Sequence, residues 1–182
     1  MEFRVYDKAS APEESRAVME QAEQALGMIP NVLGVLAESP FALSSYMTMT
    51  GLLEKSGFSP QEQQLAIVAI SAENGCRYCV AAHSGMAKQM GAPDEAIEAL
   101  RAGKPIPDAK LEALRTFAEQ LREKRGWVSD DEIQAFIDAG YKKQHVLDLI
   151  GIVALKTITN YTNHIADTPL DEAFAPMKWE GK

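Results

Sequence analysis

The sequence is poor in the residues that carry most disulfide and metal chemistry. Among its 182 residues there are only two cysteines and three histidines, and aromatic residues make up 7%. So few cysteines exclude the disulfide framework of small secreted proteins. Basic residues are also outnumbered, with 18 Lys and Arg against 26 Asp and Glu, which gives a formal net charge of −8. Nucleic acids and anionic membranes bind basic surfaces, so we expect neither as a partner.

Long hydrophobic runs are missing as well. No stretch approaches the roughly eighteen consecutive apolar residues of a membrane-spanning helix. The opening MEFRVYDKASAPEESRA lacks the basic and apolar segments of a secretory signal, so we expect a cytoplasmic protein. Hydrophobic residues make up 46%, which suffices for one buried core, and no linker or repeat divides the chain. The expectation is a single domain over residues 1–182.

The alternation of apolar and polar residues that is typical of β-strands does not occur. Helix signals are frequent instead, and capping boxes stand at Ser59 with Glu62 and at Ser129 with Glu132. Glycine or proline follows most of the apolar segments, as it does where helices end. The sequence thus predicts an all-α fold. We expect helices after the two boxes and over residues 12–26, 31–38, 41–55, 77–90, 93–101, 108–124 and 142–165.

Two of these helices are unusually apolar. Residues 65–70 are all apolar, which indicates a helix that is buried on most sides at the centre of the fold. The last helix has apolar residues on several neighbouring faces, among them Leu147, Ile150 and Val153, which is more than one core face needs. We expect part of it to be buried against another subunit, because small symmetric oligomers are common.

The two cysteines stand close together in the segment AENGCRYCVAAHSGM, residues 72–86. If a helix begins near Cys76, then Cys76, Cys79 and His83 share one face with Met86 and Met90. A helix N-terminus favours a thiolate, and His83 is placed one turn after Cys79 to take the thiol proton or stabilise the anion. Such a thiolate attacks peroxides or disulfides, and the second cysteine then resolves the product.

Other interpretations of the same residues stay open. The face could be plain core, because free cysteine packs as a small hydrophobe and methionine fills gaps. Cys76, Cys79 and His83 could also supply three zinc ligands, although a structural zinc site needs four and only His145 and His164 remain as further imidazoles. Covalent haem fits less well, since no histidine follows the second cysteine directly. A thioredoxin fold would place the motif after a strand, and here the preceding segment is helical.

The segment ENGCRYCVAAHS, residues 73–84, resembles the carboxymuconolactone decarboxylase and alkyl hydroperoxidase D superfamily, in particular its peroxidase-related branch. The likeness continues through residues 29–32, 39–40, 111–114, 125–129 and 160–167. It implies an all-α helical bundle of the alkyl hydroperoxidase D type, with helices shared at the subunit interfaces of a trimer or hexamer. It also implies reduction of a small hydroperoxide, with electrons from a protein or small-thiol reductant and without a metal or cofactor.

The resemblance also implies roles for individual residues. Cys79 would be the thiol that a proton relay activates, His83 would belong to that relay, and Cys76 would be the resolving thiol. The family's relay glutamate stands twelve residues before the first cysteine, and this sequence has Gln64 there. A neutral amide cannot accept a proton as a carboxylate does. Glu73, the nearest carboxylate in the sequence, is the candidate substitute, and an ordinary helix-end acid is the alternative.

Three functions follow from these residues taken together with the resemblance. The first is a thiol-dependent hydroperoxide reductase in antioxidant defence, with Cys76, Cys79, His83 and Glu73 as its catalytic residues. The second is a metal-binding or redox-sensing interaction protein, in which the thiols bind zinc or register oxidation without turnover. The third is a lactone decarboxylase on the same fold, which needs no thiols. His145 and His164 are interpreted as ordinary side chains, because a lone histidine is more often structural than catalytic.

Overall fold

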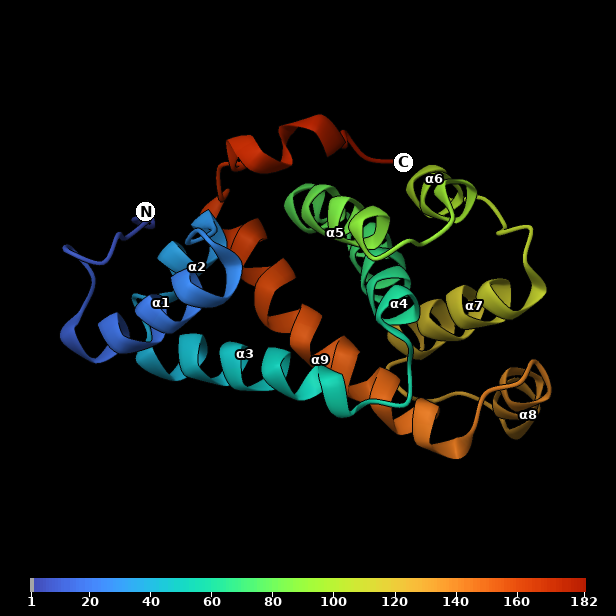
Figure 1. Cartoon of the computed structure of the whole chain (residues 1–182). Helices are drawn as coiled ribbons and strands as arrows, with labels where there is room; N and C mark the ends of the chain where they lie inside the picture. Colours follow the sequence, from blue (N-terminus) through green and yellow to red (C-terminus); the bar gives the residue numbers. More distant parts are fainter. Residues whose placement is uncertain (1) are drawn as a thin grey trace.

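The computed structural model describes residues 2–182, and these residues form a bundle of helices (Figure 1). Within this range there is no β-strand, so the all-α prediction is confirmed. Every predicted helix is present. The elements are α1 (Glu13–Leu26), α2 (Asn31–Leu36), α3 (Pro40–Leu52), η1 (Leu53–Lys55), α4 (Pro60–Glu73), α5 (Arg77–Gln89), α6 (Asp94–Ala102), α7 (Ala109–Glu123), α8 (Asp130–Asp138), α9 (Lys143–Ala166) and η2 (Glu172–Met177).

The helices begin where the chain carries local signals. At the start of α4 the Ser59 side chain accepts a hydrogen bond from the backbone N–H of Glu62, and the Glu62 carboxylate accepts one from the backbone N–H of Ser59. Ser129 and Glu132 form the same box at the start of α8. Each box satisfies N–H groups that the first helical turn leaves unpaired, and such a cap stabilises a helix by about 1 kcal/mol.

Helix α4 is the centre of the fold. All of its residues from Gln64 to Ala72 are buried, and it packs against α5, α6, α7 and α9. Burying each Leu or Ile side chain contributes about 1.5–3 kcal/mol. The continuous apolar run that the sequence shows is therefore sufficient reason for this helix to lie in the middle, as predicted.

Helix α9 runs diagonally through the molecule (Figure 1). It packs against α2 and α3 on one side and against α4, α5 and α7 on the other. The buried apolar side chains accordingly form two main clusters, one around α4, α6 and α7 and one around α1, α2 and α3. Cys76 and Cys79 belong to the second cluster. The two cysteines thus lie where α5 and α9 meet the first three helices.

The C-terminal segment crosses over α5 (Figure 1). Asp171 accepts a hydrogen bond from the Tyr78 hydroxyl, and a second at 3.1 Å from the backbone N–H of Asn31. Arg101 donates to a main-chain carbonyl of η2 at 3.0 Å, and the indole N–H of Trp179 donates to the Arg101 carbonyl at 2.9 Å. These bonds fix η2 as a cover over α5.

One face of α9 stays exposed in the described chain. Leu147, Ile150, Tyr161 and Ile165 are all exposed, and their spacing places them along one side of the helix. We call this set the α9 stripe. The predicted excess of apolar surface on this helix is confirmed, and its contact with another subunit stays a prediction. Over residues 2–182, no helix has both the length and the apolar character needed to cross a membrane.

Candidate active site

The turn between α4 and α5 brings both cysteines to the start of α5. Asn74 is the C-cap of α4, and Gly75 takes a left-handed backbone conformation with a φ of 68°. Glycine adopts this conformation without the steric cost of a Cβ atom. Cys76 is then the N-cap of α5, and Cys79 lies in the first turn. The predicted helix start is confirmed, and the positive end of the helix dipole lies at the thiols.

Both thiols are free, buried and surrounded by hydrogen-bond donors. Asn163 donates through Nδ2 to Cys79 Sγ at 3.3 Å and approaches Cys76 Sγ at 3.7 Å. The Thr159 hydroxyl is directed at Cys79 Sγ from 3.9 Å. Donors of this kind stabilise a thiolate more than a neutral thiol. The surroundings therefore favour a charged sulfur at the start of α5.

The surroundings also push the pKa values of the two thiols in opposite directions. Burial raises the pKa of Cys79, but the hydrogen bond from Cys76, the positive charge of Lys156 and the hydroxyl of Thr159 outweigh it, so the net pKa is lowered. The pKa of Cys76 is raised, first by its hydrogen bond to Cys79 and second by burial. One sulfur is thus prepared as a nucleophile while its neighbour keeps a proton.

His83 lies one turn after Cys79 but is held by two other residues. Its Nδ1 is 2.8 Å from Oε1 of Gln64, and its Nε2 is 3.0 Å from Nζ of Lys156. An ammonium only donates, so Nε2 is the acceptor and the proton of the ring is on Nδ1, from which it is donated to Gln64. Burial and the charge of Lys156 hold the pKa of His83 well below its ordinary value. The imidazole is therefore neutral at pH 7.

A buried polar face of α9 completes the site, and its residues were not among the predicted site residues. Lys156, Thr159, Asn160 and Asn163 are all buried, and they recur at the spacing of one helix face. Lys156 is the most unusual, since it is only 1% exposed and lysine is almost never fully buried. Polar residues at positions i, i+3, i+4 and i+7 inside an apolar helix are the signal that could have identified this face.

The structure does not bring Glu73 into the site. Its carboxylate forms an ion pair with Lys182, whereas the two ring nitrogens of His83 are occupied by Gln64 and Lys156. Glu73 follows Gln64 by nine positions, which is about two and a half helical turns, so the two side chains leave opposite sides of α4. The geometry therefore does not support the relay role of Glu73, and it agrees with the helix-end alternative.

The other two histidines lie apart from the thiols. His145 accepts a hydrogen bond from the backbone N–H of Lys142 at 2.8 Å and lies 3.0 Å from the Gly57 carbonyl, so it caps the start of α9. His164 is exposed near the other end of that helix. Among residues 2–182, no group of three or more His, Cys, Asp or Glu side chains is placed to hold a metal ion. The zinc interpretation thus lacks a ligand cluster in the described chain.

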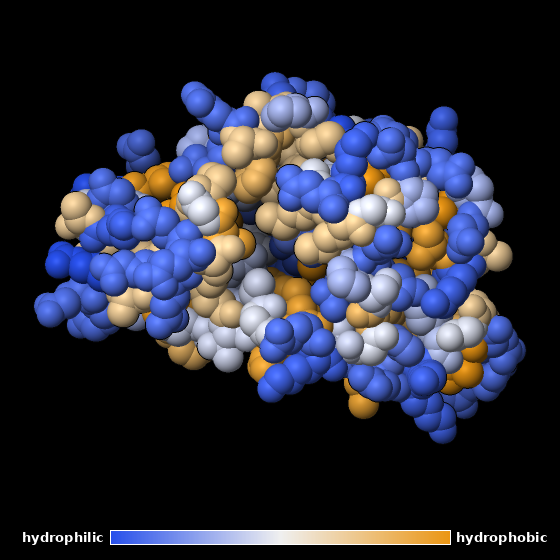
Figure 2. Space-filling model, in the orientation of Figure 1, coloured by the Kyte–Doolittle hydropathy of each residue, from blue (hydrophilic) through white to orange (hydrophobic). Residues whose placement is uncertain are grey.

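A cavity of about 250 Å³ adjoins Cys79 and is lined by residues of α1, α2, α3, α4, α5, α9 and η2. Figure 2 shows a hollow near the centre of the view, with apolar residues and residues of intermediate hydropathy along its rim. Of the two cysteines, only Cys79 lines the cavity. The Thr50 hydroxyl, also in the lining, is buried without a hydrogen-bond partner, which leaves it available to a bound molecule. The polar members of the lining are Tyr46, Thr50, Gln64, Tyr78, Cys79, His83, Lys156 and Thr159.

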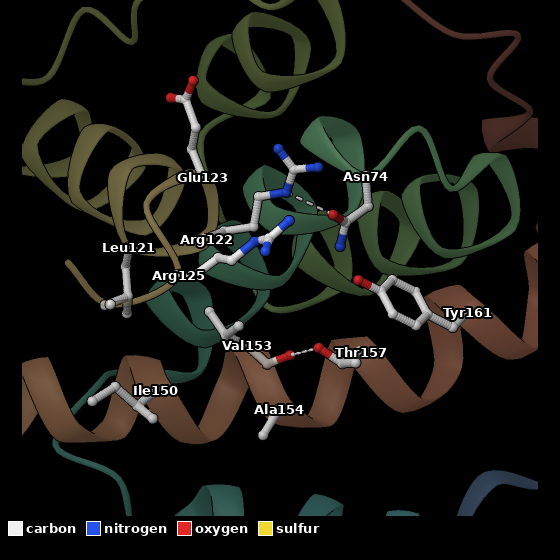
Figure 3. A pocket seen from close by; sticks show the side chains of 11 residues that line it. Asn74, Leu121, Arg122, Glu123, Arg125, Ile150, Val153, Ala154, Thr157 and Tyr161 are labelled. Carbon is white, nitrogen blue, oxygen red and sulfur yellow. Dashed lines mark hydrogen bonds between the residues drawn. The ribbon is translucent and has the colours of Figure 1, made fainter. Parts of the chain in front are cut away.

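A larger hollow of about 630 Å³ lies between the end of α7 and α9 (Figure 3). Arg122 and Arg125 extend toward it, and Arg122 donates through Nε to Oδ1 of Asn74 at 2.7 Å. Neither a cysteine nor a histidine lines this hollow. We place the chemistry at the smaller cavity, because that cavity contains Cys79, His83 and Lys156.

Comparison with known proteins gives the same all-α architecture. An uncharacterized peroxidase-related protein from Ralstonia eutropha JMP134, described as an alkylhydroperoxidase AhpD core, has a TM-score of 0.81 at 22% identity, over 94% of this chain and 93% of its own. Another from Silicibacter sp. TM1040 has a TM-score of 0.79 at 21% identity, over 96% and 92%. The debrominase Bmp8, solved in complex with 2,3,4-tribromopyrrole, has a TM-score of 0.74 at 18% identity, over 96% and 94%.

The fold and the site define an all-α protein with a buried dithiol at a helix N-terminus beside an apolar cavity. Residues 43–122 match the sequence model of the carboxymuconolactone decarboxylase family, and this range contains Cys76, Cys79 and His83. No curated protein gives a significant sequence match. The family match over these residues and the shared fold agree with the resemblance of the sequence to the carboxymuconolactone decarboxylase and alkyl hydroperoxidase D superfamily.

Proposed function

We propose that the protein is a thiol-dependent peroxidase that reduces small organic hydroperoxides in antioxidant defence. The observation that carries this proposal is a pair of free, buried thiols at the start of α5, of which only Cys79 faces the cavity. A lowered thiol pKa makes a cysteine reactive, and a largely apolar cavity favours a substrate with an apolar organic part. The unpartnered Thr50 hydroxyl in the lining offers an acceptor to the O–H group of a hydroperoxide.

The proposed cycle uses both cysteines. The Cys79 thiolate attacks the terminal oxygen of the hydroperoxide, the O–O bond breaks, and with one proton the alcohol leaves while Cys79 becomes a sulfenic acid. The Cys76 thiol then attacks that sulfur, so water is released and the Cys76–Cys79 disulfide forms. A protein dithiol or a small thiol returns two electrons and two protons. The cycle requires no metal or cofactor.

Turnover by two cysteine variants tests the proposal. With cumene hydroperoxide as substrate and dithiothreitol as reductant, Cys79→Ser is expected to lose turnover, because it lacks the nucleophile. Cys76→Ser is expected to react with peroxide but to keep the sulfenic acid, which dimedone traps as a defined mass addition. Exposed Ser129→Ala, in the cap of α8, is the control for substitution of a small side chain. Wild-type turnover in Cys79→Ser would contradict the proposal and favour a reaction that needs no thiols, such as decarboxylation.

A second candidate is the reductive dehalogenation of a small aromatic compound. The apolar cavity beside Cys79 and the structural likeness to the debrominase Bmp8 favour it. Two thiols and an aryl bromide would give the arene, bromide, a proton and the disulfide, which balances with the same two cysteines. Bromide release from 2,3,4-tribromopyrrole, measured beside consumption of cumene hydroperoxide, separates the two candidates. Faster bromide release than peroxide consumption would favour dehalogenation.

A further inference from the structure

The buried Lys156 has no part in the cycle described so far. Its side chain is 1% exposed, and among residues 2–182 no carboxylate forms an ion pair with it. Taking an ammonium out of water costs several kcal/mol unless another charge compensates it. The fold must therefore supply a counter-charge that is not a carboxylate.

The counter-charge that the cavity offers is the Cys79 thiolate. Both residues line the same cavity, and no Asp or Glu belongs to that lining. The other ionisable side chains there are His83, which is neutral, and the phenols Tyr46 and Tyr78. Burial raises the pKa of Tyr78, which also remains neutral at pH 7. The thiolate and the ammonium thus compensate each other inside a largely apolar site.

His83 holds the Lys156 ammonium by a hydrogen bond. Nε2 of His83 accepts a hydrogen bond from Lys156 at 3.0 Å, while Nδ1 is held by Gln64 at 2.8 Å. Only a neutral imidazole has a lone pair to offer to an ammonium. A carboxylate at position 64 would favour the imidazolium form, which would repel the lysine. Gln64, which departs from the family's relay, therefore suits a site whose charge comes from Lys156.

We propose that Lys156 takes the place of the missing carboxylate relay, holding Cys79 as a thiolate and donating the proton to the alkoxide that leaves during peroxide reduction. The proton-donation half of this inference rests on the proposed peroxidase function. When Cys79 attacks, Lys156 gives its proton to the leaving oxygen and becomes a neutral amine. When the disulfide is reduced, the regenerated Cys79 thiol returns a proton to that amine. The pair is neutral overall before and after each step, so no unpaired charge is buried.

Alkylation by iodoacetamide tests the thiolate half of the proposal without any peroxide. In the Cys76→Ser background Cys79 is the only thiol, and Lys156→Met should move the midpoint of the alkylation rate against pH upward by about one unit or more. Lys156→Arg keeps the charge and should stay near the parent value. Lys143→Met, exposed on the same helix, is the matched control. An unchanged midpoint in Lys156→Met overturns the proposal, and Lys156→Gln supplies the same measurement if the methionine variant does not fold.

Single-turnover oxidation tests the proton donation. The wild type and Lys156→Met are each mixed with cumene hydroperoxide at a pH above their own alkylation midpoint, so that Cys79 is ionised in both proteins. Lys156→Met is expected to react about 100-fold more slowly, which is the lower range for a lost general acid. Equal rates overturn the donation step. A wild type with the expected alkylation midpoint but no reaction with peroxide would instead contradict the peroxidase function and leave the thiolate–lysine pair intact.

Discussion

His83 and Cys79 both make the free energy of unfolding depend on pH, and with the same sign. The pKa of His83 is lowered in the folded state, so below about pH 6.5 the unfolded chain binds a proton that the folded chain does not bind. The pKa of Cys79 is lowered as well, so its contribution is present above about pH 8.5, the pKa of an unfolded thiol, and is lost as the pH falls. Stability should therefore rise with pH across this range.

Urea denaturation of the reduced protein at several pH values separates the two residues. Between the folded and the unfolded pKa of a group, the free energy of unfolding should change by about 1.4 kcal/mol per pH unit. His83→Gln is expected to reduce the dependence below about pH 6.5, where Cys79, whose pKa is lowered to about 5, still contributes. Cys79→Ser should flatten the region between about pH 6.5 and 8.5. His164→Gln, at an exposed position, is the control. A flat profile for the wild type would show that neither shift exists.

The residues of the site differ in how far the sequence could predict them. Cys76, Cys79 and His83 are neighbours in one helical segment, so their spacing alone places them on one face. Lys156 follows His83 by 73 residues and meets it only because α9 packs against α5. No local pattern encodes that contact, although the buried polar face of α9 is visible in the sequence once a helix is assumed.

At the scale of elements, most of the helices could be predicted because the residues that start or stop each helix lie next to its ends in the sequence. The capping boxes at Ser59 and Ser129 and the left-handed glycines Gly27 and Gly75 act on their own turns. The partner that a side chain meets is harder to predict, because it depends on how distant parts of the chain pack. Glu73 is the nearest carboxylate to the cysteines in sequence, yet it lies on the opposite side of α4 from Gln64 and pairs with Lys182.

The α9 stripe gives a prediction at the same scale. Its exposed apolar side chains lead us to propose that α9 packs against a second copy of the chain, as the predicted trimer or hexamer requires. Ile150→Glu puts a charge into that contact and is expected to lower the mass measured by light scattering to that of a smaller species. Trp127→Glu, at an exposed position outside α9, is the control. A wild type that is already monomeric would contradict the predicted oligomer.

At the scale of the whole molecule, the site exists because separate parts of the chain converge. Helices α4 and α5 supply the turn with the thiols, α9 supplies donors and the ammonium, and α1, α2, α3 and η2 close the cavity. Helices α4 and α5 and part of α3 lie in the family match of residues 43–122, whereas α9 lies outside it. The region that matches the family model thus carries the thiols, while the charge that we assign to Lys156 comes from the rest of the chain.

The most direct test of the account is the intact mass and thiol count of the reduced protein before and after one equivalent of cumene hydroperoxide. The proposed cycle predicts loss of both thiols and a mass decrease of about two hydrogens, because Cys79 is oxidised and Cys76 closes the disulfide. A peptide map should then show Cys76 joined to Cys79. Two persisting thiols with an unchanged mass would show that hydroperoxide is not the oxidant and would contradict the proposed peroxidase.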